Sequence, residues 1–375
     1  MKSIFWSFVA SFCALFMLSF EFEYSVFPDM YVWVQSFFER LVSFTGEIFF
    51  GLDSGFDSAI SSDSFGLLIH LFNIFCISIV LSVIFSIFFK KHSVNLRASV
   101  LKILTFYLSL QLLIYGFDKL FKAQFFYPEP NILHTNLKDL SPDILYWSTL
   151  GLSRGYSMFL GGAELVAACF LWFYKTRLTG LILGLGIMIN VVAVNLGFDI
   201  SVKVYSLFLL GCFVLVLSPY FSYLYSVLTL NSFHNIPNPA VPKLGVISGY
   251  SRGIKSGVII MILIEGLFPY VVSGNWNDDA VKRPKFHGAY RVESNQYGIE
   301  KLYIHRAGYF IVENKIGEKE DFQMELDSTN REIVLWDYRN KKEQRWKYKT
   351  EENELNELYI GMDSSVKLSC FLIKE

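Results

Sequence analysis

The chain has 375 residues, of which 53% are hydrophobic and 17% aromatic, and its formal net charge is −1. Apolar runs of about twenty residues are typical of membrane spans and rare in soluble domains. The balanced charge gives no general basic field for nucleic acid. The five cysteines are not closely paired, which argues against a disulfide framework or a zinc or redox site built on paired cysteines.

Seven apolar runs predict membrane-spanning helices. The first, residues 1–20, has no small-residue cleavage site after it and is predicted to remain as a span. The segment 31–49 has the pattern of an amphipathic helix at a membrane interface, and 51–64 reads as a loop. The other six spans are predicted over residues 65–89, 100–116, 156–174, 178–196, 204–220 and 258–272.

The distribution of basic residues predicts the orientation. Segments that would lie on the side of the N-terminus carry more Lys and Arg than the opposite segments, which predicts a cytoplasmic N-terminus. With seven spans the C-terminal tail then lies outside. We therefore expect a multi-pass membrane protein whose tail lies outside the cell membrane.

The composition changes after residue 275. Short runs with alternating apolar positions are separated by turn-like pairs, which predicts an antiparallel meander that curls or closes into a small lipocalin-like barrel. About ninety residues leave little room for a ligand in the lumen. The predicted strands cover residues 287–294, 301–305, 308–313, 322–326, 332–336, 345–349, 357–360 and 366–373. The aromatic residues expected in the barrel core are Tyr290, Tyr303, Tyr309, Trp336 and Trp346.

Polar side chains inside three predicted spans mark a candidate site. Glu164 lies near the middle of its span, where a carboxylate is costly and is expected to face a bundle interior or a wet cavity. Helical phase places Glu164 on one face with Gly161. It likewise places Asn190 with Gly186, so both polar groups are predicted to face neighbouring helices. Gln111 would complete the layer from a third helix.

The depth of these residues predicts a common level. With a rise of ~1.5 Å per residue, Glu164 lies roughly 12 Å below the start of its span, and Gln111 and Asn190 lie at a similar depth. We expect a polar layer in the outer half of the bundle. The candidate ligand-binding residues are Gln111, Tyr115, Asp118, Lys119, Tyr156, Glu164, Asn190, Asn195, Asp199 and Lys203.

Two alternatives stay open at this point. Either Lys119 or Lys203 is placed to neutralise Glu164, and without such a partner the acid would stay protonated. Alternatively, the polar residues serve only to join helices through hydrogen bonds, as polar groups in membrane bundles often do.

A set of residues in the central part of the chain forms a recognisable pattern. It consists of Tyr115-Gly116-Phe117, Lys119, Gln124-Phe125, Pro128, Ser141-Pro142, Trp147, Gly151, Ser153, Tyr156, Phe159, Gly162, Glu164, Arg177, Asn190-Val191, Asn195, Asp199, Val202-Lys203 and Ser206. With these residues the chain resembles the DoxX-like family of bacterial integral membrane proteins, in a longer form with a C-terminal β domain. A departure is Ser201, where the family pattern usually has proline. The resemblance implies a place in the bacterial inner membrane, with the β domain in the periplasm.

The resemblance implies an α-helical membrane bundle with a four-helix core, followed by a small antiparallel β-barrel or meander. The expected domains are N-terminal spans and loop at 1–98, the core at 99–225, a connector with the last span at 226–274, and the external β domain at 275–375.

The resemblance also implies a redox-associated role, because some DoxX-like proteins are linked to quinone-dependent reactions. We expect an accessory subunit with quinone as the possible cofactor, since no haem, flavin or metal motif is present. The alternatives are a small-solute binding or transport protein and a membrane-anchored assembly protein that uses its β tail. The expected partners are membrane lipid and a redox or assembly protein on the external side, with no nucleic acid.

Overall fold

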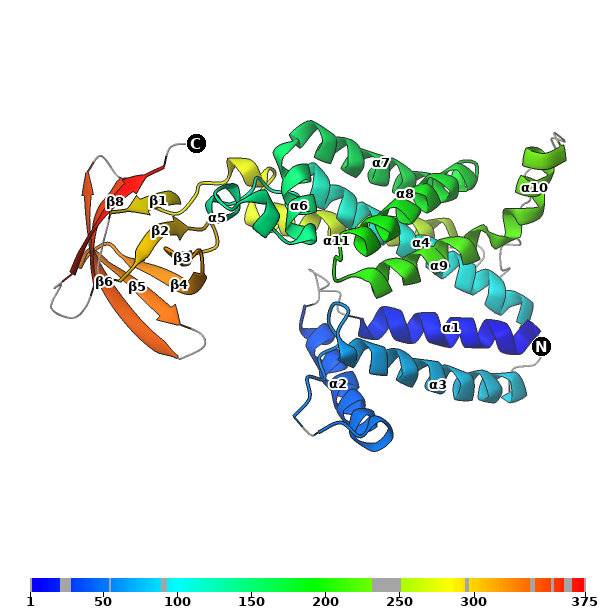
Figure 1. The fold of residues 1–375 in the computed structure, drawn as a ribbon. Coiled ribbons are helices and arrows are strands. Elements are labelled where there is room, and N and C mark those ends of the chain that lie inside the picture. Colours follow the sequence, from blue (N-terminus) through cyan, green and yellow to red (C-terminus); the bar gives the residue numbers. More distant parts are fainter. Residues whose placement is uncertain are drawn as a thin grey trace. The chain divides into compact units, whose positions relative to one another are not determined.

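The computed structural model describes residues 2–20, 28–53, 55–88, 93–230, 251–293, 297–337, 341–351, 354–360 and 366–373. Contacts divide the chain into two compact units, each built from two stretches (Figure 1). The helical unit contains Met1–Gln124 and Gly155–Trp276. The β unit contains Phe125–Arg154 and Asn277–Glu375.

The helical unit follows the predicted apolar runs closely. Among the described residues, six helical segments are long and apolar enough to cross a membrane, which is compatible with a multi-pass membrane protein. The helix at the first predicted span is shorter, with an apolar stretch of Ile4–Ser19. The helices are α1 (Lys2–Ser19), α2 (Pro28–Phe50), α3 (Phe65–Phe88), α4 (Ser93–Leu120), α7 (Arg154–Trp172), α8 (Arg177–Gly197), α9 (Lys203–Leu217), the 3-10 turn η3 (Ser218–Tyr220), α10 (Phe221–Leu230) and α11 (Ser251–Ser273). Most of the predicted connector at 231–255 lies outside the described residues.

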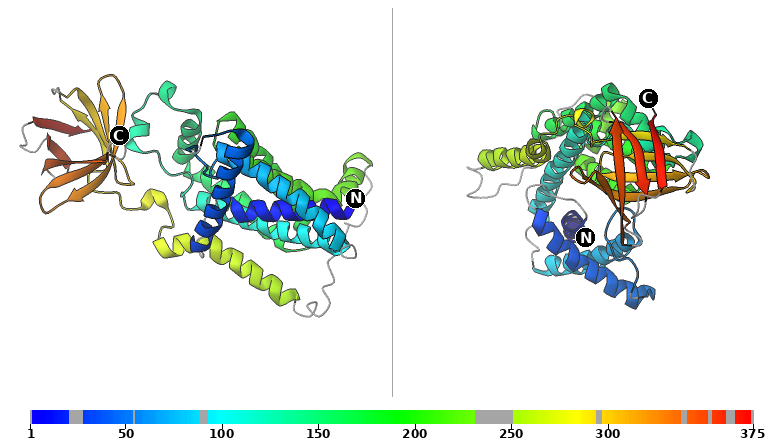
Figure 2. Two further views of the ribbon diagram at one scale, coloured as in Figure 1. Left: turned by 90° about the horizontal axis from the view of Figure 1, so that it is seen from below. Right: turned by 90° about the vertical axis from the view of Figure 1, so that its left-hand side faces the viewer.

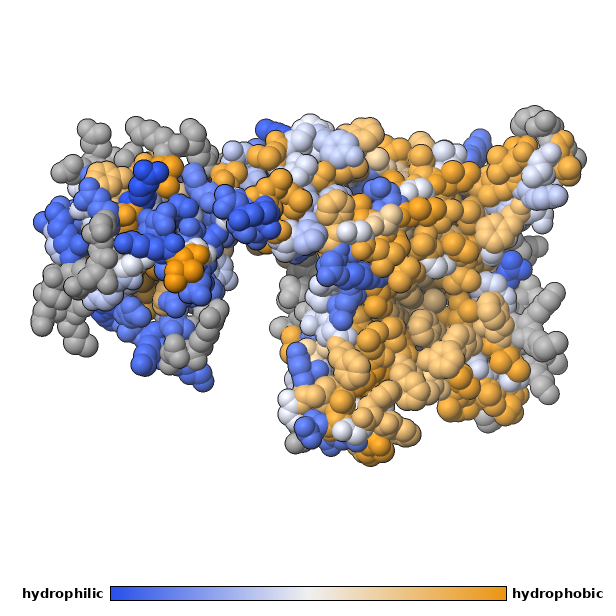
Figure 3. Space-filling view, in the orientation of Figure 1, coloured by the Kyte–Doolittle hydropathy of each residue, from blue (hydrophilic) through white to orange (hydrophobic). Residues whose placement is uncertain are grey.

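The surface of the helical unit is unusually apolar. On the face shown in Figure 3, hydrophobic residues cover most of the helices, whereas hydrophilic residues cover most of the β unit. On α3, for example, Val80 and Ile87 are 58% and 62% exposed. Continuous apolar surface of this kind marks contact with lipid or with another protein.

Helix α4 packs closely against α7 because both carry glycine at the crossing. A Cβ atom built on Gly161 would lie 2.5 Å from the carbonyl oxygen of Gly116, a distance that no side chain tolerates. The adjacent Gly162 faces open space. The close approach therefore depends on the glycine at 161, and it brings polar side chains of the two helices into contact.

The N-terminal helices add a second layer. Helix α1 lies against α3 and α4, and its Phe16 ring stacks on Phe208 of α9 with centroids 4.0 Å apart. The predicted amphipathic segment at 31–49 forms most of α2, which buries Phe38 and Val42 while Trp33 is 81% exposed. The predicted helix is confirmed, and its place at a membrane interface stays a prediction.

The C-terminal residues form a closed antiparallel barrel with the strands in sequence order, and β1 pairs with β8 (Figure 2). This confirms the predicted closed meander, and the observed strands match all of the predicted runs. The strands are β1 (Gly288–Val292), β2 (Ile299–Ile304), β3 (Tyr309–Asn314), β4 (Lys319–Asp327), β5 (Glu332–Asp337), β6 (Lys342–Glu351), β7 (Glu354–Ile360) and β8 (Val366–Leu372).

Side chains fill the inside of the barrel. Phe310 and Trp346 meet edge to face with centroids 5.5 Å apart, and Tyr290 is also buried in this core. The prediction of core positions was wrong for Tyr309 and Trp336, which are 38% and 40% exposed. In the observed register both residues pair with Gln323 and therefore lie on the outer face.

The segment between α4 and α7 belongs to the β unit, although the predicted domains placed it in the core at 99–225. It contains α5 (Pro130–Leu133), the 3-10 turn η2 (Leu137–Asp139) and α6 (Pro142–Leu152). The His134 ring stacks over Tyr303, and Lys319 donates a hydrogen bond to the Asn131 carbonyl at 3.3 Å. Tyr303 is thus buried on the outer face of the barrel, beneath this segment, and not in the lumen.

Candidate functional site

The contact between α4 and α7 shows that Lys119, and not Lys203, is the partner of Glu164. Lys119 Nζ donates to Glu164 Oε2 at 3.0 Å, and both side chains are more than nine-tenths buried. Ser157, one helical turn below the close glycine contact, donates to the Lys119 carbonyl at 2.8 Å. The acid therefore has a fixed counter-ion on the neighbouring helix.

The other polar residues near this pair come from α4 and α11. The Tyr115 ring lies beneath the Lys119 ammonium, with Nζ 5.3 Å from the ring centroid. The side chain of Asp118 accepts a hydrogen bond from the Tyr270 hydroxyl of α11. Four of the predicted site residues, Tyr115, Asp118, Lys119 and Glu164, are thus brought together.

Lys203 forms a separate cluster at the start of α9. Its ammonium lies 2.7 Å from Asp199 Oδ1 and 3.6 Å from Asp63 Oδ2. Asp63 also accepts hydrogen bonds from the backbone N–H groups of Lys203 and Val204, both at 3.0 Å. Asp63 caps the helix from the loop before α3, a role that the sequence analysis missed because the two segments are far apart in the chain.

The prediction that Asn190 faces a neighbouring helix was wrong. Asn190, Gly186 and Gly197 are exposed, and the buried face of α8 carries Gly180, Leu181, Gly184, Met188, Val192 and Asn195. The small residues that share a face with Asn190 therefore lie on the exposed side of α8. Tyr156 is also half exposed.

Two of the predicted site residues, Gln111 and Asn195, are buried and have side-chain amide atoms without a hydrogen-bond partner among the described residues. Gln111 is 2% exposed, and neither its Oε1 nor its Nε2 has a hydrogen-bond partner among the described residues. Asn195 is 4% exposed, and its Nδ2 likewise has none in the part of the chain that the structure describes. An unpaired buried amide costs about 1–3 kcal/mol, so these are positions where a ligand or water would be stabilised.

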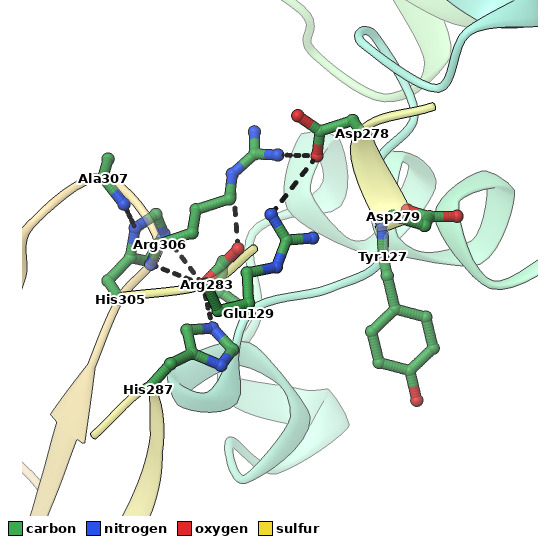
Figure 4. A network of polar contacts seen from close by, with 9 residues as sticks. All are labelled: Tyr127, Glu129, Asp278, Asp279, Arg283, His287, His305, Arg306 and Ala307. Carbon is green, nitrogen blue, oxygen red and sulfur yellow. Dashed lines mark hydrogen bonds and ion pairs between the residues drawn. The ribbon is translucent and has the colours of Figure 1, made fainter. Parts of the chain in front are cut away.

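The β unit contains a charged cluster that the sequence analysis did not find (Figure 4). Glu129 is 3% exposed and sits at its centre. Its Oε2 lies 3.0 Å from His287 Nε2 and accepts a hydrogen bond of 3.0 Å from the Arg306 backbone N–H. Its Oε1 lies 3.3 Å from Arg306 Nε. His305 contributes a further contact at 3.8 Å.

The cluster joins the inserted segment to the barrel. Glu129 comes from the segment between α4 and α7, whereas its partners come from the start of β1 and the turn after β2. The Arg306 guanidinium also covers the Phe126 ring, with Cζ 3.5 Å from the centroid. No local sequence pattern connects residues so far apart, so the sequence alone does not reveal this cluster. Within the described ranges, no group of histidine, cysteine or acidic side chains is arranged to hold a metal ion.

Burial and charge shift the ionisation of this cluster. Burial opposes ionisation of Glu129, but hydrogen bonds from His287 and Arg306 and the charges of the nearby histidines together hold its pKa below the usual value of 4.5. Burial is the main cause that lowers the pKa of His305 from its usual 6.5, and Glu129 opposes that shift only in part.

Comparisons with known proteins give little on function. No family model matches the chain, and no solved structure matches it. The chain is similar to the uncharacterized protein YwoB of Bacillus subtilis (strain 168), with 29% identity over 107 residues that cover 28% of this chain and 68% of that protein. This similarity assigns no activity to the chain, and the resemblance to DoxX-like proteins stays a prediction.

We predict that Glu164→Gln destabilises the helical unit by about 3–5 kcal/mol, because the substitution leaves the Lys119 ammonium buried without its counter-ion. Thermal unfolding of the purified protein in detergent measures the effect. Glu47→Gln, at an exposed position of α2, is the matched control and should leave unfolding unchanged. Wild-type stability of Glu164→Gln would show that the pair does not hold α4 to α7.

Acidification is predicted to destabilise the β unit in two steps. The folded state disfavours protonation of His305, so stability is lost as the pH falls below 6.5 towards the lowered folded pKa. Glu129 adds a second loss as the pH falls below 4.5 through its own lowered pKa. Thermal unfolding at a series of pH values should show both steps, and His305→Gln should remove the first and reduce the second, because His305 is one of the groups that lower the pKa of Glu129. An unchanged pH profile in that variant would contradict the assignment.

Proposed function

We propose that the chain is a multi-pass membrane protein that presents its β-barrel as an interaction module. The observation that carries this proposal is the filled interior of the barrel, where Phe310, Trp346 and their neighbours occupy the space that a ligand would need. Small eight-stranded barrels either hold one small ligand or are filled by their own side chains. A filled barrel acts through its outer surface.

The membrane placement rests on the helical unit. Six helical segments of sufficient length and hydropathy, with large exposed apolar side chains along them, suit a lipid environment. In line with the distribution of basic residues, the proposal includes a bacterial inner membrane, a cytoplasmic N-terminus and a periplasmic barrel. The predicted role of an assembly protein with an external partner fits this arrangement.

The outer face of the barrel offers a candidate contact surface. Tyr309 on β3 and Trp336 on β5 are both exposed and flank Gln323 of β4 in the register. Exposed tyrosine and tryptophan are enriched at protein interfaces, because they bury much area with few rotatable bonds. We call Tyr309, Gln323 and Trp336 the aromatic row.

A photo-crosslinking amino acid at Gln323 tests the proposal in cells. We expect a discrete adduct with another protein, and we expect Trp336→Ala to reduce it about tenfold or more, as for the loss of an interface anchor. The control places the same amino acid at Lys347, an exposed position on β6. Equal adducts at both positions, or no adduct at Gln323, would contradict a partner on the aromatic row.

A second candidate function is the predicted quinone-linked redox role. The observation in its favour is the buried amide of Gln111, which has no partner among the described residues and lies on α4, the helix that also carries Lys119 of the Lys119–Glu164 pair. A quinone head group presents carbonyl oxygens that an amide N–H can bind. Because Asn190 faces outward, this candidate would use Gln111 and Asn195 in place of the predicted set around Asn190.

Gln111→Leu separates a ligand site from a simple packing defect. Removing an unsatisfied buried amide is expected to raise the thermal stability of purified, ligand-free protein by about 1–3 kcal/mol. If the amide binds a quinone in cells, the same variant should also lose co-purifying quinone. Unchanged or absent quinone in both proteins would remove the redox candidate and leave the assembly proposal intact.

A further inference from the structure

An open hollow in the β unit is lined almost entirely by basic residues. Its volume is about 690 Å³. It lies between the segment that enters the barrel and the turn after β2. The lining residues are Lys282, Arg283, Pro284, Lys285 and Arg306.

The charges in the hollow are only partly balanced. Asp278 contacts both Arg283, at 3.7 Å, and Arg306. Lys282 and Lys285 make no ion pair with any residue that the structure describes. Lys285 lies instead over the rings of Phe286 and Tyr348, with Nζ 4.9 and 5.7 Å from their centroids. The hollow therefore keeps an excess of positive charge, with its two lysines exposed.

The chain fixes this basic stretch close to the end of an apolar segment. Lys282 lies nine residues after Ser273, the last residue of α11, and the sixth candidate span extends beyond α11 to Ala280. Nine residues reach at most about 30 Å, whatever the arrangement of the two units. Trp276, which is 49% exposed, lies just before this point. Tryptophan at the end of a span is typical of the head-group level of a bilayer.

We propose that this hollow binds the phosphate of an anionic phospholipid head group. The inference rests on the membrane placement proposed above. An arginine guanidinium offers paired donors to phosphate oxygens, and the lysines add mobile point charges. Each basic residue next to the membrane surface strengthens the binding of anionic lipid by roughly fivefold, so two lysines have a measurable effect. The fixed Arg283 and Arg306, held by Asp278, would orient the phosphate, and the lysines would supply the excess charge.

Lipid selectivity of the full-length protein tests the proposal. The protein is reconstituted with equal amounts of phosphatidylglycerol and phosphatidylcholine, and the retained lipid is counted by native mass spectrometry. We expect preferential retention of phosphatidylglycerol, and a fall of about tenfold in that preference for Lys282→Gln/Lys285→Gln. Lys282→Arg/Lys285→Arg should keep the preference. The control Lys342→Gln/Lys347→Gln removes the same charge from exposed positions on β6 and should behave as wild type.

Several outcomes would overturn the inference. These are an unchanged preference in Lys282→Gln/Lys285→Gln, or an equal loss in the control, which would indicate a general charge effect. Saturable binding of inorganic phosphate by calorimetry, without lipid preference, would assign the hollow to a soluble anion. Binding of an acidic protein segment in place of lipid would assign the hollow to a protein partner. Release of the whole protein from membranes by alkaline carbonate would instead reject the membrane placement, and so the proposed function itself.

Discussion

The helical unit depends on the match between two buried charges. An isolated carboxylate or ammonium in an apolar bundle is costly, and either one alone would favour a different packing of α4 and α7. The Lys119–Glu164 contact at 3.0 Å removes that cost for both groups at once. It forms only because Gly116 and Gly161 let the two backbones approach. The same two helices carry, between them, the segment that enters the β unit, so the ion pair fixes the ends of that insertion.

The β unit also pairs a buried acid with neighbouring groups, but here the partners are histidine and arginine. Its strands close without help, since β1 pairs with β8 and the core is filled. The inserted segment adds a cover over Tyr303 and a buried acid, Glu129, that gathers donors from two places on the barrel. One chain segment thereby contributes to both units through its flanking helices and its own contacts. The β unit therefore contains a stretch from the middle of the sequence in addition to the barrel.

Periodicity was enough to predict much of this architecture. Apolar runs of span length and alternating short runs are local signals, so the helices and all eight strands followed from them. The helical phase of Glu164 also identified its buried face correctly. The same reasoning failed for Asn190, because small residues at helical spacing suit either a packing face or an outer face, and only tertiary contacts decide between them. Glu129, Asp63 and the exposure of Trp336 depend on pairings between distant segments, which a single sequence does not record.

The distribution of charge favours work at surfaces over work in a central cavity. The most costly buried charges, Glu164 and Glu129, are already paired within the protein. Groups in balanced contacts of this kind stabilise the fold and have little capacity left for a substrate. Unbalanced charge lies on the β unit, at the basic hollow, and the outer face of the barrel carries exposed aromatic side chains at the aromatic row. The basic hollow suits an anionic head group near the end of a span, and the aromatic row suits a protein partner. A barrel anchored to lipid through the first would be held at the membrane surface while the second stays available, which is the arrangement that an assembly protein requires.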